Sequence, residues 1–269
     1  MSAPRVWFIT GVSSGIGRAA AEAALAHGDT VYGSLRQPEQ FAAFEQLAPG
    51  RAFALQLDVT QPGQIAHAVQ RVLSGGRIDV LVNNAGIGMV GAVEESSLAE
   101  VRSVFEINFF GALQLMQAFL PQMRQQKSGH IINISSGVGL NALPGMPIYS
   151  ASKHALEGLS EALAGEVAAL GIKVSLIEPG AILTAFTGPG MVEAQHKLSD
   201  YEAVSGYGRA GLNHYYQEQA AKPETVAQAI LAVADHPAPP LRKLVGSDVP
   251  HAARTRLERM QQLLDAAQT

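Results

Sequence analysis

The sequence contains no cysteine among its 269 residues, so disulfide bonds and thiol chemistry are excluded. It also lacks an unbroken apolar run of roughly eighteen residues, and we therefore expect no membrane-spanning helix. The net charge of −4 is small and negative, which argues against a nucleic-acid partner. Because the first strand is expected to begin at Arg5, no room is left for a cleaved signal sequence, and we expect a cytoplasmic location.

No linker, low-complexity tract or block of like charge divides the chain, so residues 1–269 are expected to form one domain. The expected strands are residues 5–9, 30–36, 51–57, 79–82, 130–134, 173–177 and 241–245. Helices are expected at 18–27, 100–123, 150–170, 223–235 and 250–264, the last a largely polar helix that covers an edge of the sheet. Strands that alternate with helices indicate an α/β fold, here a Rossmann-type doubly wound parallel sheet with helices on both faces.

Three polar residues form a candidate catalytic group: Ser136, Tyr149 and Lys153. Tyr149 and Lys153 are four residues apart, so a helix through this stretch places both side chains on one face. A free tyrosine titrates near ~10, but a cation within roughly 4–6 Å favours the phenolate. With a serine hydroxyl beside it, such a pair can move a proton on or off an alcohol or ketone oxygen. The Tyr-x-x-x-Lys spacing also occurs by chance in many helices, so it is not diagnostic by itself.

A glycine-rich turn follows the first expected strand, in the run Thr10-Gly11-Val12-Ser13-Ser14-Gly15-Ile16-Gly17. An alanine-rich helix comes next and is closed by Gly28 as a C-cap. A strand, a glycine-rich turn and a helix direct backbone N–H groups and a helix N-terminus at a phosphate. The spacing Gly-x-x-x-Gly-x-Gly departs from the common dinucleotide fingerprint Gly-x-Gly-x-x-Gly. Its position after a strand at the start of the chain nevertheless favours a dinucleotide site.

Polar residues, glycine or proline lie at or just past the ends of six expected strands. They are Gly11, Arg36, Asp58, Asn84, Ser136 and Pro179. Ligands of a parallel sheet bind at the carboxyl ends of its strands, where these positions converge. The strand order therefore predicts one cofactor site at one edge of the sheet, without reference to any known protein.

The end of the second strand indicates which dinucleotide is bound. A carboxylate there would accept hydrogen bonds from a free ribose 2′-hydroxyl and repel a 2′-phosphate. The sequence has Leu35 and then Arg36, and a guanidinium makes strong charge-assisted bonds to phosphate. Ser14 can donate a further bond. We therefore expect NADP(H) to be preferred, with NAD(H) possible; the alternative is that Arg36 is a solvated residue that opens a loop.

Together these motifs resemble the short-chain dehydrogenase/reductase family in its common short subclass. The resemblance covers Thr10 to Thr184. The residues that carry it are Thr10-Gly11-x-x-x-Gly15-Ile16-Gly17, Asp58-Val59, Asn83-Asn84-Ala85-Gly86, Asn108, Ser136, Tyr149, Lys153 and Pro179-Gly180 followed by Thr184. In overall pattern the chain is most similar to the branch that contains 17β-hydroxysteroid and retinol dehydrogenases.

The resemblance implies a role for each matching residue. Tyr149 would be the catalytic acid and base, and Ser136 would polarise the substrate oxygen; the family spacing selects Ser136 over Ser135. Lys153 would lower the pKa of Tyr149 and bind the nicotinamide ribose, and Asn108 would hold a water that links Lys153 to solvent. Thr184 would contact the carboxamide, and Asp58 the adenine amino group. The expected cofactor-binding residues are Gly11, Ser13, Ser14, Gly15, Ile16, Gly17, Arg36, Asp58, Val59, Asn84, Ala85, Gly86, Tyr149, Lys153, Pro179, Gly180, Ile182 and Thr184.

The expected reaction is reversible hydride transfer between the nicotinamide and a hydrophobic ketone or secondary alcohol. The residues expected to line the substrate pocket are apolar: Gly88, Met89, Val138, Leu143, Met146 and Phe186. Residues 187–222 are expected to form a substrate lid, because long loops in compact domains are often functional. No metal-ligand cluster is found, and the scattered histidines are interpreted as core or solvated residues.

Two further expectations concern partners. In the family, helices at the positions of 100–123 and 150–170 commonly pair between subunits, so we expect a homodimer or homotetramer. The alternative is that both helices pack only on their own sheet.

An alternative function is that of a redox sensor, which binds the cofactor without catalysis and acts through protein partners. This alternative is disfavoured because such relatives usually lack the tyrosine or the lysine.

Overall fold

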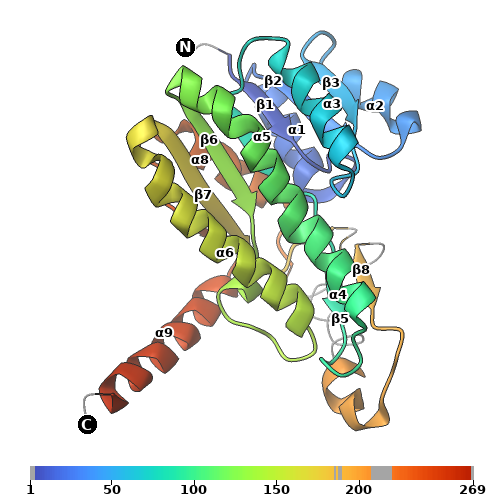
Figure 1. Ribbon diagram of the computed structural model, residues 1–269, viewed down its shortest axis with the longest axis vertical. Helices are drawn as coiled ribbons and strands as arrows, with labels where there is room; N and C mark the ends of the chain where they lie inside the picture. Colours follow the sequence, from blue (N-terminus) through green and yellow to red (C-terminus); the bar gives the residue numbers. More distant parts are fainter. Residues whose placement is uncertain (1–3, 185, 187–189, 207–219, 268–269) are drawn as a thin grey trace.

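A seven-stranded sheet forms the centre of the computed structural model, which describes residues 4–184, 186, 190–206 and 220–267. The strand order is β3-β2-β1-β4-β6-β7-β9, and every neighbouring pair is parallel (Figure 1). The strands are β1 (Val6–Ile9), β2 (Thr30–Leu35), β3 (Ala52–Gln56), β4 (Val80–Asn83), β6 (Gly129–Ile134), β7 (Ile172–Pro179) and β9 (Arg242–Val245). The predicted doubly wound parallel sheet is confirmed.

The direction of winding reverses between β1 and β4. The chain runs outward from β1 through β2 to β3, then returns to place β4 on the other side of β1. Such a reversal opens a crevice at the carboxyl ends of the two central strands, because their connections leave toward opposite faces. The glycine-rich turn after β1 lies beside this crevice, so the topology by itself defines where a ligand fits.

Helices cover both faces of the sheet and bury two separate cores. One face carries α1 (Gly15–Ala26), α2 (Phe41–Glu45), reached through the short turn η1 (Pro38–Gln40), and α8 (Pro223–Asp235). The other carries α3 (Pro62–Leu73), α5 (Gly111–Gln126) and α6 (Pro147–Val167), which ends in η4 (Ala168–Leu170). In β1, Trp7 and Ile9 point into the first core and Phe8 into the second, as the alternation of strand side chains requires.

The expected helix at 100–123 is longer than predicted and contains a wide turn. It consists of α4 (Leu98–Phe105), the π-helical turn η2 (Glu106–Phe110) and α5. Ser97 and Glu100 begin it with a capping box, in which each side chain bonds the other residue's backbone N–H. A π turn accommodates one extra residue per turn and is frequent at functional sites. Here it lies at Asn108.

This continuous helix, Leu98–Gln126, has the length and mean hydropathy, 1.2, of a membrane-spanning segment. It is the one helix in the described part of the chain that meets these two criteria. Core helices also meet them, and Leu115, Phe119 and Met123 of this helix are buried against the sheet. The sequence analysis, which searched for unbroken apolar runs, did not predict a helix that meets these criteria.

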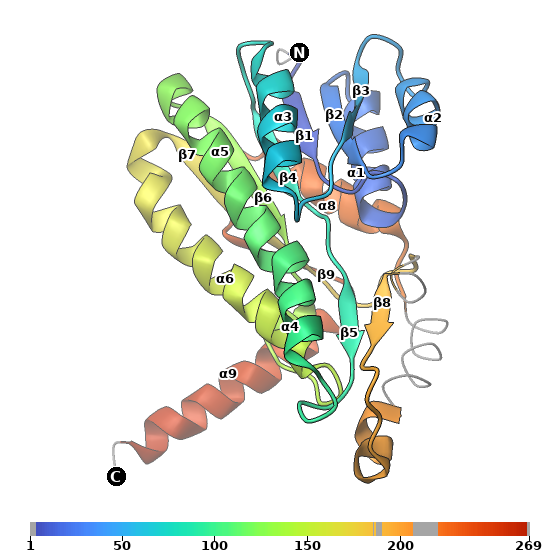
Figure 2. The ribbon, with the colours of Figure 1, turned by 45° about the vertical axis from the view of Figure 1, so that its right-hand side comes forward.

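The expectation that the C-terminal helix covers a sheet edge is wrong. In Figures 1 and 2, α9 (Val249–Ala266) projects away from the body of the protein. Val249, in its first turn, is buried near Gly137, whereas Leu257, Leu263 and Leu264 are more than half exposed. Beyond its first turn, the helix therefore leaves its apolar side chains exposed on the surface of the chain and does not pack on the sheet.

A second, two-stranded sheet was not predicted from the sequence. It pairs β5 (Gly88–Val90) with β8 (Met191–Glu193) in parallel, beside the short turns η6 (Ser199–Tyr201) and η7 (Glu202–Gly206) (Figure 2). Both turns and β8 belong to the expected lid, residues 187–222. Residues 187–189 and 207–219 of that expectation lie outside the described residues.

Three acidic side chains hold the described part of the lid. The buried carboxylate of Glu95 accepts hydrogen bonds from the backbone N–H of Ala92 and of Leu198, at 2.8 and 3.0 Å. Glu100 accepts from the N–H of Gln195 at 2.9 Å, and Glu94 accepts from the hydroxyl of Tyr201 at 2.8 Å. Hydrogen bonds to ionised acceptors are the stronger kind, so these contacts tie residues 195–201 to the segment before α4 and to the first turn of α4.

Replacing Glu95 with alanine should therefore loosen the lid. The buried N–H of Ala92 and the half-buried N–H of Leu198 would lose their acceptor, at a cost of about 1–3 kcal/mol in the free energy of unfolding. Amide hydrogen exchange at residues 195–201 should become faster. Glu94→Ala is the matched control, since its carboxylate is exposed and should cost much less. Equal exchange in the two variants would contradict the proposed anchoring.

Candidate active site

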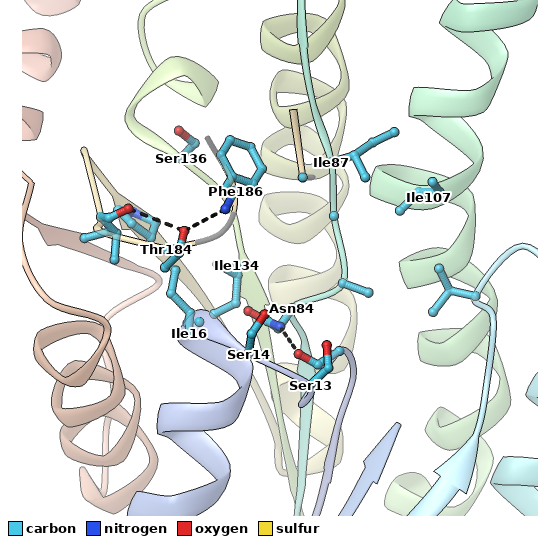
Figure 3. Close-up of a pocket in the computed structure, with 18 of the residues that line it drawn as sticks. Ser13, Ser14, Ile16, Asn84, Ile87, Ile107, Ile134, Ser136, Thr184 and Phe186 are labelled. Carbon is cyan, nitrogen blue, oxygen red and sulfur yellow. Dashed lines mark hydrogen bonds between the residues drawn. The ribbon is translucent and has the colours of Figure 1, made fainter. Parts of the chain in front are cut away.

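A cavity of about 430 Å³ lies at the carboxyl ends of the strands. It is lined by every expected cofactor-binding residue except Gly17, and by Ser136. Figure 3 shows part of this lining, including Ser14, Asn84, Ser136 and Thr184. The lining also includes residues that the sequence analysis did not name: Ser34, Leu57, Ile87, Ile107, Ile134 and Gly190. Asn108, the fourth expected catalytic residue, lies behind the wall formed by Ile87 and Ile107.

The glycine-rich turn approaches the end of β4 too closely to carry side chains. Gly11 and Gly15 have φ angles of +72° and +59°, in the region that L side chains rarely adopt. A Cβ atom on Gly17 would overlap the carbonyl oxygen of Gly11 and the amide nitrogen of Asn84. Gly17 therefore serves the packing of α1 against the turn and not the cavity surface.

Thr10 and Asn84 fasten the turn to the end of β4. The hydroxyl of Thr10 accepts hydrogen bonds from the N–H groups of Asn84 and Ala85, at 2.8 and 2.9 Å. The side-chain amide of Asn84 donates to the carbonyl of Thr10 at 2.7 Å. From the other side, Ser34 of β2 accepts the N–H of Gly11 at 2.9 Å. The resemblance implied that the backbone around Asn84 supports the cofactor ribose and the central strand, and the structure adds that the Asn84 side chain braces the turn.

Tyr149 and Lys153 lie in the first turns of α6, which begins at Pro147. Both side chains are buried, and the Lys153 Nζ atom is 5.8 Å from the centre of the Tyr149 ring. The ammonium donates a hydrogen bond to the carbonyl of Ile134, at the end of β6, at 2.8 Å. Burial lowers the pKa of Lys153 to about 8, while the charge of Glu157 acts in the opposite direction.

Asn108 is held rigidly by its neighbours. Its side-chain amide donates to the carbonyl of Ile87 at 2.9 Å and to the hydroxyl of Ser152 at 3.0 Å. Its carbonyl oxygen accepts the N–H of Ile87 at 2.9 Å. A side chain on Gly86 would lie between this oxygen and the Lys153 Nζ atom. Asn108 thus joins the π turn, the start of β5 and α6 immediately beside Lys153.

Both serines after β6 line the cavity, but their hydroxyls have different surroundings. Ser136 lies at the cavity, and its hydroxyl accepts the N–H of Val138 at 3.4 Å in the turn η3 (Gly137–Gly139) (Figure 3). Ser135 is buried, and its hydroxyl faces Glu157 on α6. This geometry supports Ser136 as the serine available to a substrate.

The far end of the cavity is lined by Arg36 and Asp58. Arg36 is exposed and makes no ion pair with any residue in the described ranges. Asp58 accepts hydrogen bonds from the N–H and hydroxyl of Thr60, at 2.9 and 2.8 Å, through one carboxylate oxygen. Leu35, the last residue of β2, is buried. Among the described residues that line this end of the cavity, the charged groups are therefore a cation without an ion pair and a partly bonded carboxylate.

An apolar wall lies on the other side of Tyr149. Val90, Met146 and Tyr149 pack with Val138, Phe186 and Met191, and the rings of Tyr149 and Phe186 have centres 5.6 Å apart. Of the six residues expected to line the substrate pocket, Val138, Met146 and Phe186 belong to this cluster, and Phe186 also lines the cavity. Gly88, Met89 and Leu143 are not part of the cluster. Met89 is buried with Val104 and Ala194, because alternation along β5 turns it away, and Leu143 is 45% exposed.

The loop after β7 is held by a residue from the C-terminal part of the chain. The carboxylate of Asp248, at the start of α9, accepts the N–H of Ala181 at 3.1 Å. It fills the space that a side chain on Gly180 would need. Further along the loop, Thr184 lies over Gly15 and accepts the N–H of Phe186 at 3.2 Å. No sequence signal pointed to Asp248.

The chain is similar in sequence to known oxidoreductases. The family model described as short chain dehydrogenase matches residues 5–192. Oxidoreductase BOA17 of Botryotinia fuckeliana is 40% identical, with 91% of this chain and 89% of that protein covered. Bovine retinol dehydrogenase 8 is 36% identical (90% and 81% covered), and human 17-beta-hydroxysteroid dehydrogenase type 1 is 38% identical (88% and 76% covered).

Solved structures share the fold over nearly the whole chain. A short-chain dehydrogenase from Streptomyces avermitilis is 42% identical, with a TM-score of 0.91 and 99% and 97% of the two chains covered. A relative from Burkholderia phymatum in complex with NAD is 26% identical (TM-score 0.84; 97% and 95% covered). A metagenomic oxidoreductase in complex with NADP is 29% identical (TM-score 0.71; 90% and 96% covered).

Gly17→Ala should destabilise the protein, because the added methyl group overlaps the Gly11 carbonyl and Asn84. Overpacking of this kind costs about 1–3 kcal/mol in the free energy of unfolding, measured by chemical denaturation. Gly158→Ala is the matched control. Gly158 is exposed in α6 with open space around it, so alanine there should be neutral or stabilise by about 0.5–1 kcal/mol. A Gly17→Ala variant as stable as the wild type would show that the turn can move away from β4.

Proposed function

Because the chain belongs to the short-chain dehydrogenase/reductase family, we propose that it transfers hydride reversibly between a nicotinamide dinucleotide and the carbon of a hydrophobic ketone or secondary alcohol. The observation that carries this proposal is the position of Tyr149, which lies between the Lys153 ammonium and an apolar wall at one end of the cavity. A proton donor, a cation and an apolar surface at one place are what the reduction of such a carbonyl requires.

The residues present fit a dinucleotide. The glycine-rich turn leaves space at the N-terminus of α1, where backbone N–H groups favour a pyrophosphate. Asp58 and Arg36 line the end expected for the adenosine half, and Thr184 and Lys153 line the end expected for the nicotinamide. When bound, the nicotinamide supplies or accepts the hydride.

The side chains of the protein handle the proton. In the reducing direction, the Tyr149 hydroxyl donates its proton to the oxygen of the substrate as negative charge develops there. Ser136 donates a second hydrogen bond to the same oxygen and holds it in place. The Lys153 ammonium stabilises the phenolate that Tyr149 becomes, and Asn108, which lies near Lys153 beside Gly86, would hold the water that links Lys153 to solvent.

Arg36 supports a preference for NADP(H). Its guanidinium is exposed at the cavity, and Leu35 occupies the position where a carboxylate would repel a 2′-phosphate. A charged hydrogen bond contributes roughly 1.5–3 kcal/mol, which corresponds to on the order of ten- to a hundredfold discrimination. Among the relatives of similar fold, one structure holds NAD and another NADP, so the preference has to come from this chain's own residues.

The substrate class follows from the apolar wall around Tyr149. Met146, Met191 and Phe186 offer no hydrogen-bonding side chains to a sugar, whereas they can bury hydrocarbon. The names of the retinol and 17-beta-hydroxysteroid dehydrogenase relatives indicate substrates of that kind.

We further propose that the protein is a homo-oligomer paired through α5 and α6; the exposed ring of Phe110, at the start of α5, supports this.

Tyr149→Phe should keep the fold and cofactor binding but lower the rate of ketone reduction by on the order of 10²–10⁴-fold, because the proton donor is lost. NADPH oxidation by a panel of hydrophobic ketones measures the rate, and fluorescence titration with NADPH measures binding. A variant that turns over like the wild type would sink the proposed role of Tyr149.

Arg36→Ala should remove most of the preference for NADPH over NADH, measured as the ratio of kcat/KM for the two cofactors. The loss should fall mainly on NADPH, since NADH lacks the 2′-phosphate. Arg102→Ala is the control: it removes the same charge from an exposed position on α4 and should leave the ratio unchanged. If Arg36→Ala also leaves the ratio unchanged, Arg36 does not select the cofactor.

A further inference from the structure

Two glutamates lie buried behind Lys153, outside the lining of the cavity. Glu157 follows Lys153 by one turn of α6, and Glu178 lies in β7 directly before Pro179. Their side chains are only 6% and 0% exposed. Carboxylates are rarely buried to this extent, since burial removes the hydration of the charge. The proposed reaction, as described above, uses neither of them.

The positive charge near this pair is insufficient for two ionised carboxylates. Arg242 of β9 lies 3.3 Å from a Glu157 oxygen and 3.5 Å from a Glu178 oxygen. The same guanidinium is 3.0 Å from Glu161 and is 33% exposed. One cation is thus divided among three carboxyl groups. Two buried like charges in contact raise each other's pKa until one of them binds a proton.

The hydrogen bonding also indicates that one of the two carboxyl groups is protonated. In the described residues, the carboxyl oxygens of Glu157 and Glu178 and the hydroxyl of Ser135 lack hydrogen bonds of good geometry. Buried polar oxygens without a donor are costly. A proton on one carboxyl supplies the missing donor, because its O–H can bond the other carboxylate. One shared proton therefore relieves both the repulsion and the unsatisfied oxygens.

The surroundings decide which glutamate stays ionised. Glu157 faces the Ser135 hydroxyl, and it stabilises the Lys153 ammonium one turn away. Burial, and then repulsion by Glu157, raise the pKa of Glu178 to about 8. The charged or titratable groups around the pair are Lys153, His154 and Glu161 from α6 and Arg242 from β9. Burial also raises the pKa of Glu157, but the Ser135 hydroxyl opposes that rise, so we assign the proton at neutral pH to Glu178.

We propose that Glu157 and Glu178 hold one proton between them, and that the negative charge left on Glu157 keeps Lys153 protonated for the reaction. The inference rests on the proposed function, because it concerns the cation beside Tyr149. Tyr149, Lys153 and Glu157 recur every four residues along one face of α6. Glu157 and Glu178 act through Lys153 and are therefore positioning residues.

The test is the pH profile of kcat for NADPH-dependent ketone reduction. Glu157→Gln removes the charge that supports Lys153, so the fall in rate at alkaline pH should begin about one pH unit lower than in the wild type. Glu157→Asp keeps the charge and should largely restore the wild-type profile. Glu178→Gln resembles the protonated carboxyl in shape and charge, so it should move the profile much less. Glu161→Gln, at the exposed carboxylate bound to the same arginine, is the control.

A second readout does not depend on catalysis. In the folded protein the pKa of Glu178 is about 8, so this side chain keeps its proton up to that pH. In the unfolded chain it loses the proton near its ordinary pKa of 4.5. This group's contribution to stability is therefore present at low pH and lost as the pH rises through that range. The stability of Glu178→Gln relative to the wild type should increase from pH 5 to pH 8, as measured by urea unfolding at each pH.

The two readouts separate the possible failures. If the wild type reduces no ketone, the proposed function fails, and the stability profile still reports the shared proton. If Glu178→Gln shifts the rate profile as far as Glu157→Gln, or if the stability difference does not depend on pH, the shared proton is overturned. If Glu157→Gln does not fold, the other two variants decide the question. The proposal is supported if Glu157→Asp and Glu178→Gln both keep the wild-type pH profile of kcat. Any other pattern contradicts it.

Discussion

The burial of the Lys153 ammonium is the constraint on which the candidate active site depends. An ammonium loses its hydration on entering the protein, and this chain replaces it with the carbonyl of Ile134 and the nearby charge of Glu157. That carbonyl is at the end of β6, so the cation can only be satisfied where α6 packs against the strand end. The position of Tyr149, four residues earlier, follows from the same packing. Catalytic geometry is thus set by the need to stabilise one buried charge.

The topology of the sheet determines how the rest of the cavity is arranged. Winding that reverses between β1 and β4 opens the crevice. The hydrogen bonds between Thr10 and Asn84, and between Gly11 and Ser34, fix the glycine-rich turn at its edge. The proposed cofactor site and the proposed proton-transfer site share strand ends, so neither can shift without the other. The Asp248 carboxylate extends this rigidity to the loop after β7.

Much of this arrangement could be predicted from the sequence, because it depends on local signals. Apolar runs located all seven strands of the main sheet, and the positions that follow them located the cavity. The Tyr149–Lys153 spacing and the glycine-rich turn were readable for the same reason, since each is specified within a few residues. The predicted residues that the structure brings to the cavity are those attached to a strand end or to a single helix face.

What the sequence did not reveal depends on contacts between distant segments. Asp248 and Gly180 are 68 residues apart, and β5 and β8 are too short to show a periodic pattern. The buried pair of Glu157 and Glu178 was hidden because each resembles a solvated helix or strand residue when read alone. Met89 was misassigned because the alternation along β5 could not be known before the strand itself was.

The central claim is that this chain passes hydride from a nicotinamide to the carbon of a hydrophobic ketone. NADPH carrying deuterium at C4 of its nicotinamide, incubated with the protein and a panel of such ketones, tests it directly by mass spectrometry of the alcohols formed. The account predicts that deuterium from one face of the ring appears on the carbinol carbon. NADPH that binds tightly while every ketone is recovered unlabelled would contradict it.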